Sequence, residues 1–413
     1  MALALTQRRS IALALCACAL AGCDAGGGSL APTVTSRREL AHAHAPHTAH
    51  VTDPALALAP DGTPHLAWIR ADGTDRQIRT AALRGDDGDR VRVDPGAHPI
   101  AEAHQPPGLA VGRDGRVHVS WASPRRDPGA SPFASDLVLA SSEDGGRRFA
   151  APLRLNEDRP GSRGFESIAV DARGDVIAAW IESGADSGPA TRAARVAAGA
   201  VVERAELGAR TCPCCRISVA ADETGRVGVL WRDEFAGSVR DMVFAQSPGA
   251  PFSFAASERV HDDGWVFAAC PHRGGALAFA PGGRAVAAWY SEGRKSEPAL
   301  WLAGRGDGGF ATPLAVHEES SSQPDRVALA IGADGAGLVL WERRSPVRSE
   351  IAARAIDAQG RPGPVRVVSD GVHASGPVLV ARPGGAFVAA WNEEAFPSLH
   401  TVVAELALQA AEP

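Results

Sequence analysis

Seven tryptophans recur along this chain at nearly even intervals, and this repetition constrains the fold more than any other feature. Neighbouring members of the set are 50 to 59 residues apart, and a glycine lies six residues before each one. The tryptophans are Trp68, Trp121, Trp180, Trp231, Trp289, Trp341 and Trp391. The glycines are Gly62, Gly115, Gly174, Gly225, Gly283, Gly335 and Gly385. Such self-similarity predicts an architecture built from seven copies of one unit.

The residues around each tryptophan describe a β-hairpin. In 56–68 and 109–121, a short apolar run leads to a turn containing Asp and Gly, and an alternating apolar run then ends at Trp. The glycine supplies the positive φ that a tight turn requires. Two further short strands follow in each unit, such as 136–140 and 151–155 in the second. Four antiparallel strands per unit are typical of a propeller blade. The sequence therefore predicts an all-β, seven-bladed β-propeller, with six blades as the alternative, and tryptophans packed between neighbouring sheets.

The last unit indicates how the ring closes. It ends after its third strand, at 400–406, and no fourth strand follows. Upstream of the first unit, 47–52 has the pattern of a fourth strand. We expect this N-terminal segment to complete the seventh blade, which would remove an open sheet edge.

The N-terminus has the pattern of an export signal. Arg8 and Arg9 precede an apolar run over 10–20 that is too short to span a membrane. The run ends in Leu-Ala-Gly-Cys23, which resembles a bacterial lipoprotein cleavage site. The resemblance implies that 1–22 is a signal peptide, that Cys23 is lipidated, and that the protein is extracytoplasmic and held to a bacterial membrane, either in the periplasm or at the cell surface.

The remaining chain divides into a tether and a propeller. Residues 23–46 are rich in small and polar residues, which is typical of a flexible linker, and 47–408 hold the repeats. The formal net charge is −6, and loss of the two signal-peptide arginines makes it more negative. An acidic body argues against a nucleic-acid partner. We expect a monomer whose membrane contact is the lipid.

One turn carries a family resemblance. Ser142-Glu-Asp144-Gly-Gly146-Arg-Arg-Phe149 lies between the third and fourth strands of the second unit. It resembles the Asp-box, or BNR repeat, of the sialidase superfamily. In that superfamily the serine and aspartate bond turn amides while the aromatic packs between strands. The resemblance implies a sialidase-like propeller and says nothing of catalysis.

A second resemblance covers the fourth and fifth units. Cys212-Pro-Cys-Cys-Arg216 and Cys270-Pro271 are similar to segments of bacterial sialidase-like lipoproteins. Sialidases use three arginines, a tyrosine nucleophile with a glutamate partner, and an aspartate acid/base. This chain has a single tyrosine, Tyr290, and lacks the Arg-Ile-Pro segment that normally supplies the first arginine. Whether the protein is an enzyme stays open at this point.

Candidate site residues follow from the propeller topology. Loops between blades and loops after the second strand open on one face, so their polar residues converge at the mouth of the central channel. The candidate catalytic residues are Tyr290, Glu292, Arg232, Asp233 and Arg294. The candidate ligand-binding residues are Arg216, Arg240, Asp241 and Arg343.

The cysteines form a separate group. Beyond the signal peptide and Cys23, the chain has Cys212, Cys214, Cys215 and Cys270, and His272 follows the last of them. Adjacent blades should place these segments side by side. Outside the cytoplasm, four cysteines favour disulfides, including one that joins the Cys212–Cys215 cluster to Cys270. The alternative is a copper or zinc site made by the thiolates and His272.

Three functions are compatible with these patterns. The leading hypothesis is a propeller that binds a carbohydrate or other polar ligand at the channel mouth, with exo-glycosidase activity as an extension. The first alternative is an extracytoplasmic copper, zinc or redox protein that uses the cysteines. The second alternative is a scaffold that binds another envelope protein.

Overall fold

The computed structural model describes residues 29–41, 49–72, 74–84, 89–93, 97–100, 102, 105–127, 130–184, 187–317, 322–371, 373–395 and 398–411. The expected signal peptide, 1–22, and the expected lipidation site, Cys23, lie outside these residues. Of the expected tether, only 29–41 is described. The described residues contain no helix long and apolar enough to cross a membrane.

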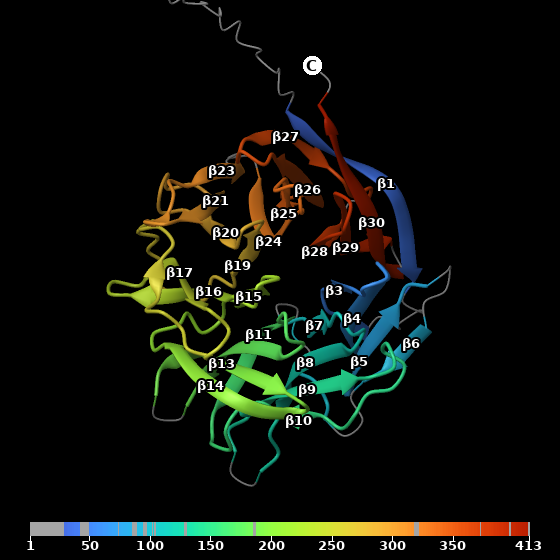
Figure 1. Ribbon diagram of the computed structural model, residues 1–413, viewed down its shortest axis with the longest axis vertical. Helices are drawn as coiled ribbons and strands as arrows, with labels where there is room; N and C mark the ends of the chain where they lie inside the picture. The colour runs from blue at the N-terminus through green and yellow to red at the C-terminus, as the bar shows by residue number, and fades with distance from the viewer. Residues whose placement is uncertain are drawn as a thin grey trace, which may run out of the picture.

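The described strands form seven antiparallel sheets arranged in a ring, so the seven-bladed propeller is confirmed (Figure 1). The first blade contains β2 (Ala49–Val51), β3 (Ala55–Leu58), β4 (Pro64–Asp72), β5 (Asp75–Ala82) and β6 (Asp89–Arg92), and the second contains β7 (Gly108–Val111), β8 (Val117–Pro124), β9 (Ser135–Ser142) and β10 (Leu153–Arg154). The third blade contains β11 (Ser162–Val170), β12 (Val176–Ser183), β13 (Pro189–Ala197) and β14 (Ala200–Gly208), and the fourth contains β15 (Ser218–Ala221), β16 (Val227–Phe235), β17 (Val239–Ser247) and β18 (Glu258–Arg259).

The last three blades complete the ring. The fifth blade contains β19 (Gly275–Ala280), β20 (Arg284–Ser291), β21 (Ala299–Gly306), β22 (Gly309–Phe310) and β23 (Leu314–His317). The sixth contains β24 (Gln323–Ile331), β25 (Gly337–Arg344), β26 (Ser349–Ile356) and β27 (Pro362–Val367), and the seventh contains β28 (Ala374–Ala381), β29 (Ala386–Ala395), β30 (Ser398–Ala410) and β1 (Leu30–Ala41). The inner strands, nearest the ring axis, are β3, β7, β11, β15, β19, β24 and β28.

The repeated tryptophans and glycines have the roles that their spacing predicts. Each of the seven glycines has a positive φ, between 79° and 90°. Each of the seven tryptophans is at most 3% exposed. Apart from a small cluster of three cysteines, the described buried apolar residues fall into seven clusters, and each of these joins two consecutive blades around one of the tryptophans. The hydrophobic core is therefore distributed among the blade interfaces.

The ring closes through the N-terminus, but the closing strand is not the expected one. β1 pairs antiparallel with β30, from Leu30 opposite Ala410 to Ala41 opposite His400 (Figure 1). The segment 47–52 was expected in this place; instead β2 pairs with β4 in the first blade. Part of the expected tether is thus strand. Its Pro, Thr, Ser and Arg residues are compatible with an edge strand, whose outer side needs no apolar partner.

The turn that resembles an Asp-box has the expected hydrogen bonds. The amide of Gly146 donates to Ser142 Oγ at 2.9 Å, and the amides of Arg147 and Arg148 donate to Asp144 Oδ1 at 3.0 and 2.9 Å. Phe149 packs against the apolar cluster between the first two blades. The motif acts here as a turn-forming device.

Candidate functional site

A cavity of about 320 Å³ lies on the ring axis, lined by residues at and just before the inner strands of all seven blades. Its most regular feature is a ring of apolar side chains, one per blade, that are 7–9% exposed. These are Leu56, Leu109, Ile168, Val219, Leu277, Leu329 and Leu379. We call this space the axial cavity. Seven equivalent apolar residues give it a nearly symmetrical wall.

Three residues before each member of the apolar ring is a second set of equivalent residues, which we call the entry positions. They are Asp53, Pro106, Phe165, Arg216, Gly274, Arg326 and Gly376, each fifteen residues before a repeated tryptophan. All except Phe165 line the axial cavity. The residues at the entry positions thus differ in charge and polarity from blade to blade, whereas those of the apolar ring are all aliphatic.

Irregular pairing at three blades explains how some entry residues are aimed. The register between the first two strands shifts around Phe165, Arg326 and Gly376, and these residues have φ values of 56°, 47° and 63°. Such bulges free a residue from the ladder and turn its side chain. In the third blade the bulge turns Phe165 away from the cavity and onto neighbouring cysteines.

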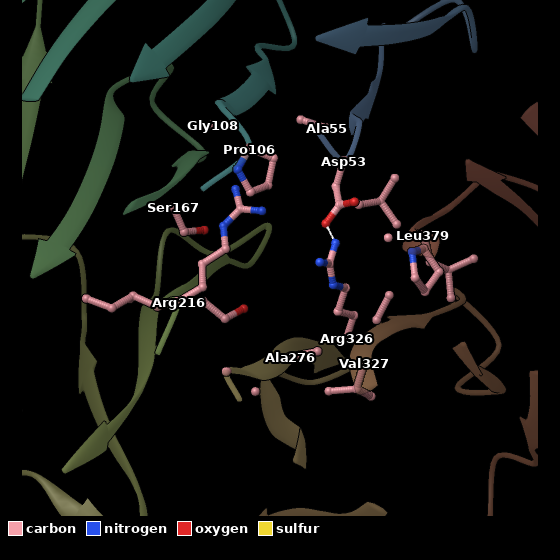
Figure 2. A pocket seen from close by; sticks show the side chains of 18 of the residues that line it. Asp53, Ala55, Pro106, Gly108, Ser167, Arg216, Ala276, Arg326, Val327 and Leu379 are labelled. Carbon is pink, nitrogen blue, oxygen red and sulfur yellow. Dashed lines mark ion pairs between the residues drawn. The ribbon is translucent and has the colours of Figure 1, made fainter. Parts of the chain in front are cut away.

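Arg216 supplies a positive charge to the axial cavity (Figure 2). Its Nε donates to the carbonyl of Glu166 at 3.1 Å, and its Nη2 donates to the carbonyl of Pro107 at 3.4 Å. It forms no ion pair with any described residue. The Glu166 carboxyl acts on it electrostatically, but burial raises the pKa of that carboxyl and favours its neutral form. Burial lowers the pKa of Arg216 and the nearby Glu166 carboxyl raises it, so Arg216 is a buried guanidinium whose acidic neighbour does not form an ion pair with it.

Across the cavity, Asp53 and Arg326 form an ion pair (Figure 2). Glu342 lies 3.7 Å from Nε of Arg326 and adds a second negative charge. The pair fits because Gly376, at the neighbouring entry position, has no side chain. A Cβ there would clash with the Asp53 carboxyl. Arg326 is therefore compensated, in contrast to Arg216.

Three cysteines gather beside the cavity. Cys212 Sγ lies 3.2 Å from Cys215 Sγ and 3.8 Å from Cys214 Sγ, and all three sulfurs lie within 4.8 Å of one another. Their residues are 0%, 5% and 0% exposed for Cys212, Cys214 and Cys215. Hydrogen bonds from Cys214 and Cys215 lower the pKa of Cys212, whereas burial raises that of Cys215. We call these residues the cysteine triad.

The fourth cysteine is not part of this group. Cys270 is exposed and free, and the described cysteines form no disulfide. The predicted bridge from the cluster to Cys270 is therefore absent from the structure. His272 is not among the ligand atoms that gather with the sulfurs. It lies nearby, with its ring centroid 6.2 Å from that of Phe165, and lines the axial cavity with Cys214.

The candidate catalytic residues lie on the fourth and fifth blades, and none of them lines the axial cavity. Tyr290 is 2% exposed and its hydroxyl donates to Glu292, as a tyrosine–glutamate pair would require. Burial raises the pKa of Tyr290, which opposes formation of the phenolate. Arg232 is fully buried and donates to the carbonyls of Arg273, Arg240 and Tyr290 at 2.6 to 2.9 Å. These bonds join the fourth and fifth blades.

Asp233 and Arg294 also have local structural partners. Asp233 accepts a hydrogen bond from the indole of Trp231 at 2.7 Å, and burial raises its pKa to about 6. An acidic residue two positions after Trp180 and Trp391 accepts in the same way. Arg294 contacts His261 and stacks over Trp301. None of the five candidate catalytic residues, all described, lines the axial cavity.

Of the four candidate ligand-binding residues, only Arg216 lines the cavity. Arg240 donates to the carbonyl of Phe267 at 3.1 Å and pairs with Glu234 at 2.9 Å. Asp241 is fully buried, which raises its pKa, and accepts amide bonds at 3.3 and 3.4 Å. Arg343 pairs with Glu350 at 2.7 Å.

Sequence reasoning missed Asp53, Arg326 and Ser167 as cavity residues. A signal for the first two was present, since Arg216 and these residues stand at the same distance before a tryptophan. The polar residues that follow the tryptophans were ranked above them. Among those residues, Asp233, Glu234 and Arg343 have an indole or ion-pair partner within their own blade.

Comparison with known proteins supports the fold and leaves the activity open. No protein-family model matches the chain, and no curated protein matches it either. A protein of unknown function from Dyadobacter fermentans DSM 18053 is 13% identical, with 92% of this chain and 99% of that chain covered and a TM-score of 0.54. A PL25 ulvan lyase is 9% identical, with 91% and 94% covered and a TM-score of 0.56.

The microbial sialidase Hz136 is more distant in shape. It is 12% identical, with 83% of this chain and 76% of that chain covered and a TM-score of 0.47. At these identities the likenesses to the Dyadobacter protein and the ulvan lyase show a shared fold and nothing of the activity. The resemblance to lipoproteins with a Cys-Pro-Cys-Cys segment stays a prediction.

Proposed function

We propose that this protein is a lipid-anchored, extracytoplasmic propeller that binds a polar ligand of the carbohydrate class, bearing an acidic group, in its axial cavity. The observation that carries the proposal is Arg216, a guanidinium that lines the cavity and forms no ion pair with any described residue. A ligand carboxylate or sulfate would supply the missing charge and accept charge-assisted hydrogen bonds.

The rest of the cavity suits a sugar. Its volume of about 320 Å³ falls in the range of about 300–1,000 Å³ that is usual for ligand sites. The hydroxyls of Ser167 and Ser218 each accept an amide hydrogen bond at 3.1 Å, so each hydroxyl proton is left for a ligand. The apolar ring offers a surface for C–H groups. The Asp-box resemblance and the polysaccharide lyase of similar fold guide the choice of ligand class.

The geometry supports binding rather than hydrolysis. The titratable side chains that line the cavity, within the described part of the chain, are Asp53, Cys214, Arg216, His272 and Arg326. Asp53 is held by Arg326, so it does not form the pair of free carboxylates that most glycosidases use.

Titration calorimetry with acidic and neutral oligosaccharides tests the proposal. We expect the protein to bind an acidic sugar, and Arg216→Gln to weaken binding by about 1.5–3 kcal/mol, the value of a hydrogen bond to a charged group. The matched control is Arg226→Gln, because Arg226 also donates to backbone carbonyls but lies outside the cavity lining. Unchanged affinity in Arg216→Gln, or no binding by the intact protein, would contradict the proposal.

The anchor has its own test. Cys23 follows the small residues of the cleavage motif, so Cys23→Ser should stop incorporation of labelled palmitate and move the protein from the membrane fraction to the soluble fraction. Membrane association that survives Cys23→Ser would show that the lipid is not the anchor.

A further inference from the structure

The cysteine triad is a second candidate site, made by side chains other than that of Arg216. An odd number of buried thiols cannot all be satisfied by disulfides with one another. The remaining cysteine, Cys270, is exposed and stands outside the group. Three converging sulfurs do match the needs of a soft metal ion.

The loop that presents the sulfurs is fixed by its neighbours. The amide of Cys212 donates to the carbonyl of Arg232 at 2.8 Å, and the amide of Ile217 donates to the carbonyl of Phe165 at 3.0 Å. Next to the loop, Gly274 packs so closely that a Cβ there would lie 2.6 Å from the carbonyl oxygen of Arg216. The sulfurs are therefore held together before any ion arrives, which lowers the cost of binding.

The surroundings separate the triad from water while leaving one approach. Phe165 packs over the thiols, and its unusual backbone conformation directs it there instead of into the cavity. Cys214 alone of the three lines the axial cavity. An ion can thus reach the sulfurs from the cavity past Cys214, close to His272.

The donor set distinguishes between metals. No histidine or carboxylate atom gathers with the three sulfurs among the described residues. Zinc is almost always four-coordinate, so it would need a further ligand. Thiolates select copper(I), and three of them complete a low-coordinate site. The positive charges of Arg232 and Arg240 act on the triad and offset part of the negative charge of three thiolates.

We propose that Cys212, Cys214 and Cys215 bind one copper(I) ion, which enters from the axial cavity. Each Cu–S bond forms as a thiol gives up its proton to solvent, and copper remains in the +1 state throughout. The site requires no oxidant or reductant. It leaves out Cys270 and His272, whose ligand atoms do not gather with the three sulfurs.

Anaerobic titration of the full chain with copper(I), in competition with a chromophoric copper(I) chelator, tests the site. We expect one ion per chain. Loss of an outer-shell partner costs about 10–100-fold in metal affinity, so loss of a sulfur in Cys214→Ser should cost more than about 100-fold. Cys270→Ser is the matched control and should bind as the unaltered protein does. Retained binding in Cys214→Ser, or loss of binding in Cys270→Ser, would overturn the assignment.

Two further measurements show whether a loss of binding comes from misfolding of the variant or from oxidation of the thiols. Copper(I) should raise the melting temperature of the unaltered protein and of Cys270→Ser but not that of Cys214→Ser, whose metal-free melting temperature reports its folding. Thiol titration of the denatured, signal-free, lipidated protein should find the four cysteines of the mature propeller reduced. Two missing thiols would indicate a disulfide, and tighter binding of zinc than of copper(I) would exclude copper as the resident ion.

Discussion

Two rings of equivalent residues run around this propeller, and they are occupied in opposite ways. The tryptophan positions hold the same residue in all seven blades, each buried between two sheets. The entry positions, fifteen residues earlier, hold an acid, two arginines, two glycines, a proline and a phenylalanine. The same residue recurs at the tryptophan positions because every blade must fill the same space between two neighbouring sheets. Diversity at the entry positions marks the place where the blades are free to differ, and both candidate sites lie there.

Deletion of the closing strand, β1, would show whether the propeller needs the pairing of β1 with β30 to fold. Deletion of 30–41 removes β1 and leaves β30 as an open edge. We expect aggregation or loss of cooperative unfolding, followed by size-exclusion chromatography and calorimetry. Deletion of 24–28, which leaves β1 in place, is the control. A soluble 30–41 deletion with a sharp melting transition would show that closure is dispensable.

A substitution at a tryptophan position should lower the free energy of unfolding more than one at an entry position does. Trp289→Ala removes a fully buried side chain between the fourth and fifth blades and should lower the free energy of unfolding by about 3–5 kcal/mol. At an entry position, Arg216→Gln should cost less than about 2 kcal/mol, because its hydrogen bonds adjoin a cavity. Denaturant unfolding measures both, with exposed Phe133 as an alanine control. Equal losses would erase the distinction between the rings.

The acid that follows Trp231 predicts a dependence on pH. Burial raises the pKa of Asp233 from 3.8 to about 6, so between these values the folded protein binds a proton that the unfolded chain has released. Stability should therefore fall by about 1–2 kcal/mol as the pH rises from about 4 to about 6. Asp233→Asn, which keeps an oxygen for the indole, should remove this fall. The exposed Asp262→Asn should leave it, and a fall unchanged in Asp233→Asn would show that another group is responsible.

The smallest expected effect concerns the Asp-box turn. Ser142 is buried and accepts the Gly146 amide, so Ser142→Ala should cost about 0.5–1.5 kcal/mol, the net value of one hydrogen bond. The equivalent Ser247→Ala in the fourth blade removes a similar bond to Gly249. Thermal unfolding of the two variants would show whether a complete Asp-box stabilises its turn more than a partial one does, and a larger loss in Ser247→Ala would reverse that ranking.

The sequence predicted the ring because every blade solves the same problem with the same residues. The positive φ at Gly62 and the burial of Trp68 are local requirements that recur six more times. The closing strand was misplaced because 30–41 has the composition of a linker and only its pairing with β30 makes it a strand. No local pattern reports a partner at the far end of the chain.

The site was less accessible to sequence reasoning. Arg216 and the cysteine triad stood out by residue type, but whether an arginine is compensated depends on neighbours from other blades. Arg326 and Arg216 occupy equivalent positions, and only the structure shows that one is paired with Asp53. Cys270 was grouped with the triad because thiols of adjacent blades were assumed to meet, whereas its side chain is exposed.

The pairing of Leu30 with Ala410 has a kinetic consequence. Most sheets in this molecule form from strands close together in the chain, and such local contacts are made quickly. Three strands of the last sheet, β28, β29 and β30, are also close together, but its fourth strand, β1, comes from the other end of the chain, so the entropy of closing the longest loop opposes this one pairing. Until that happens, β30 is an open sheet edge. We therefore expect the pairing of β1 with β30 to be the slowest step of assembly and the one most exposed to aggregation, because it follows the local pairing of the other strands.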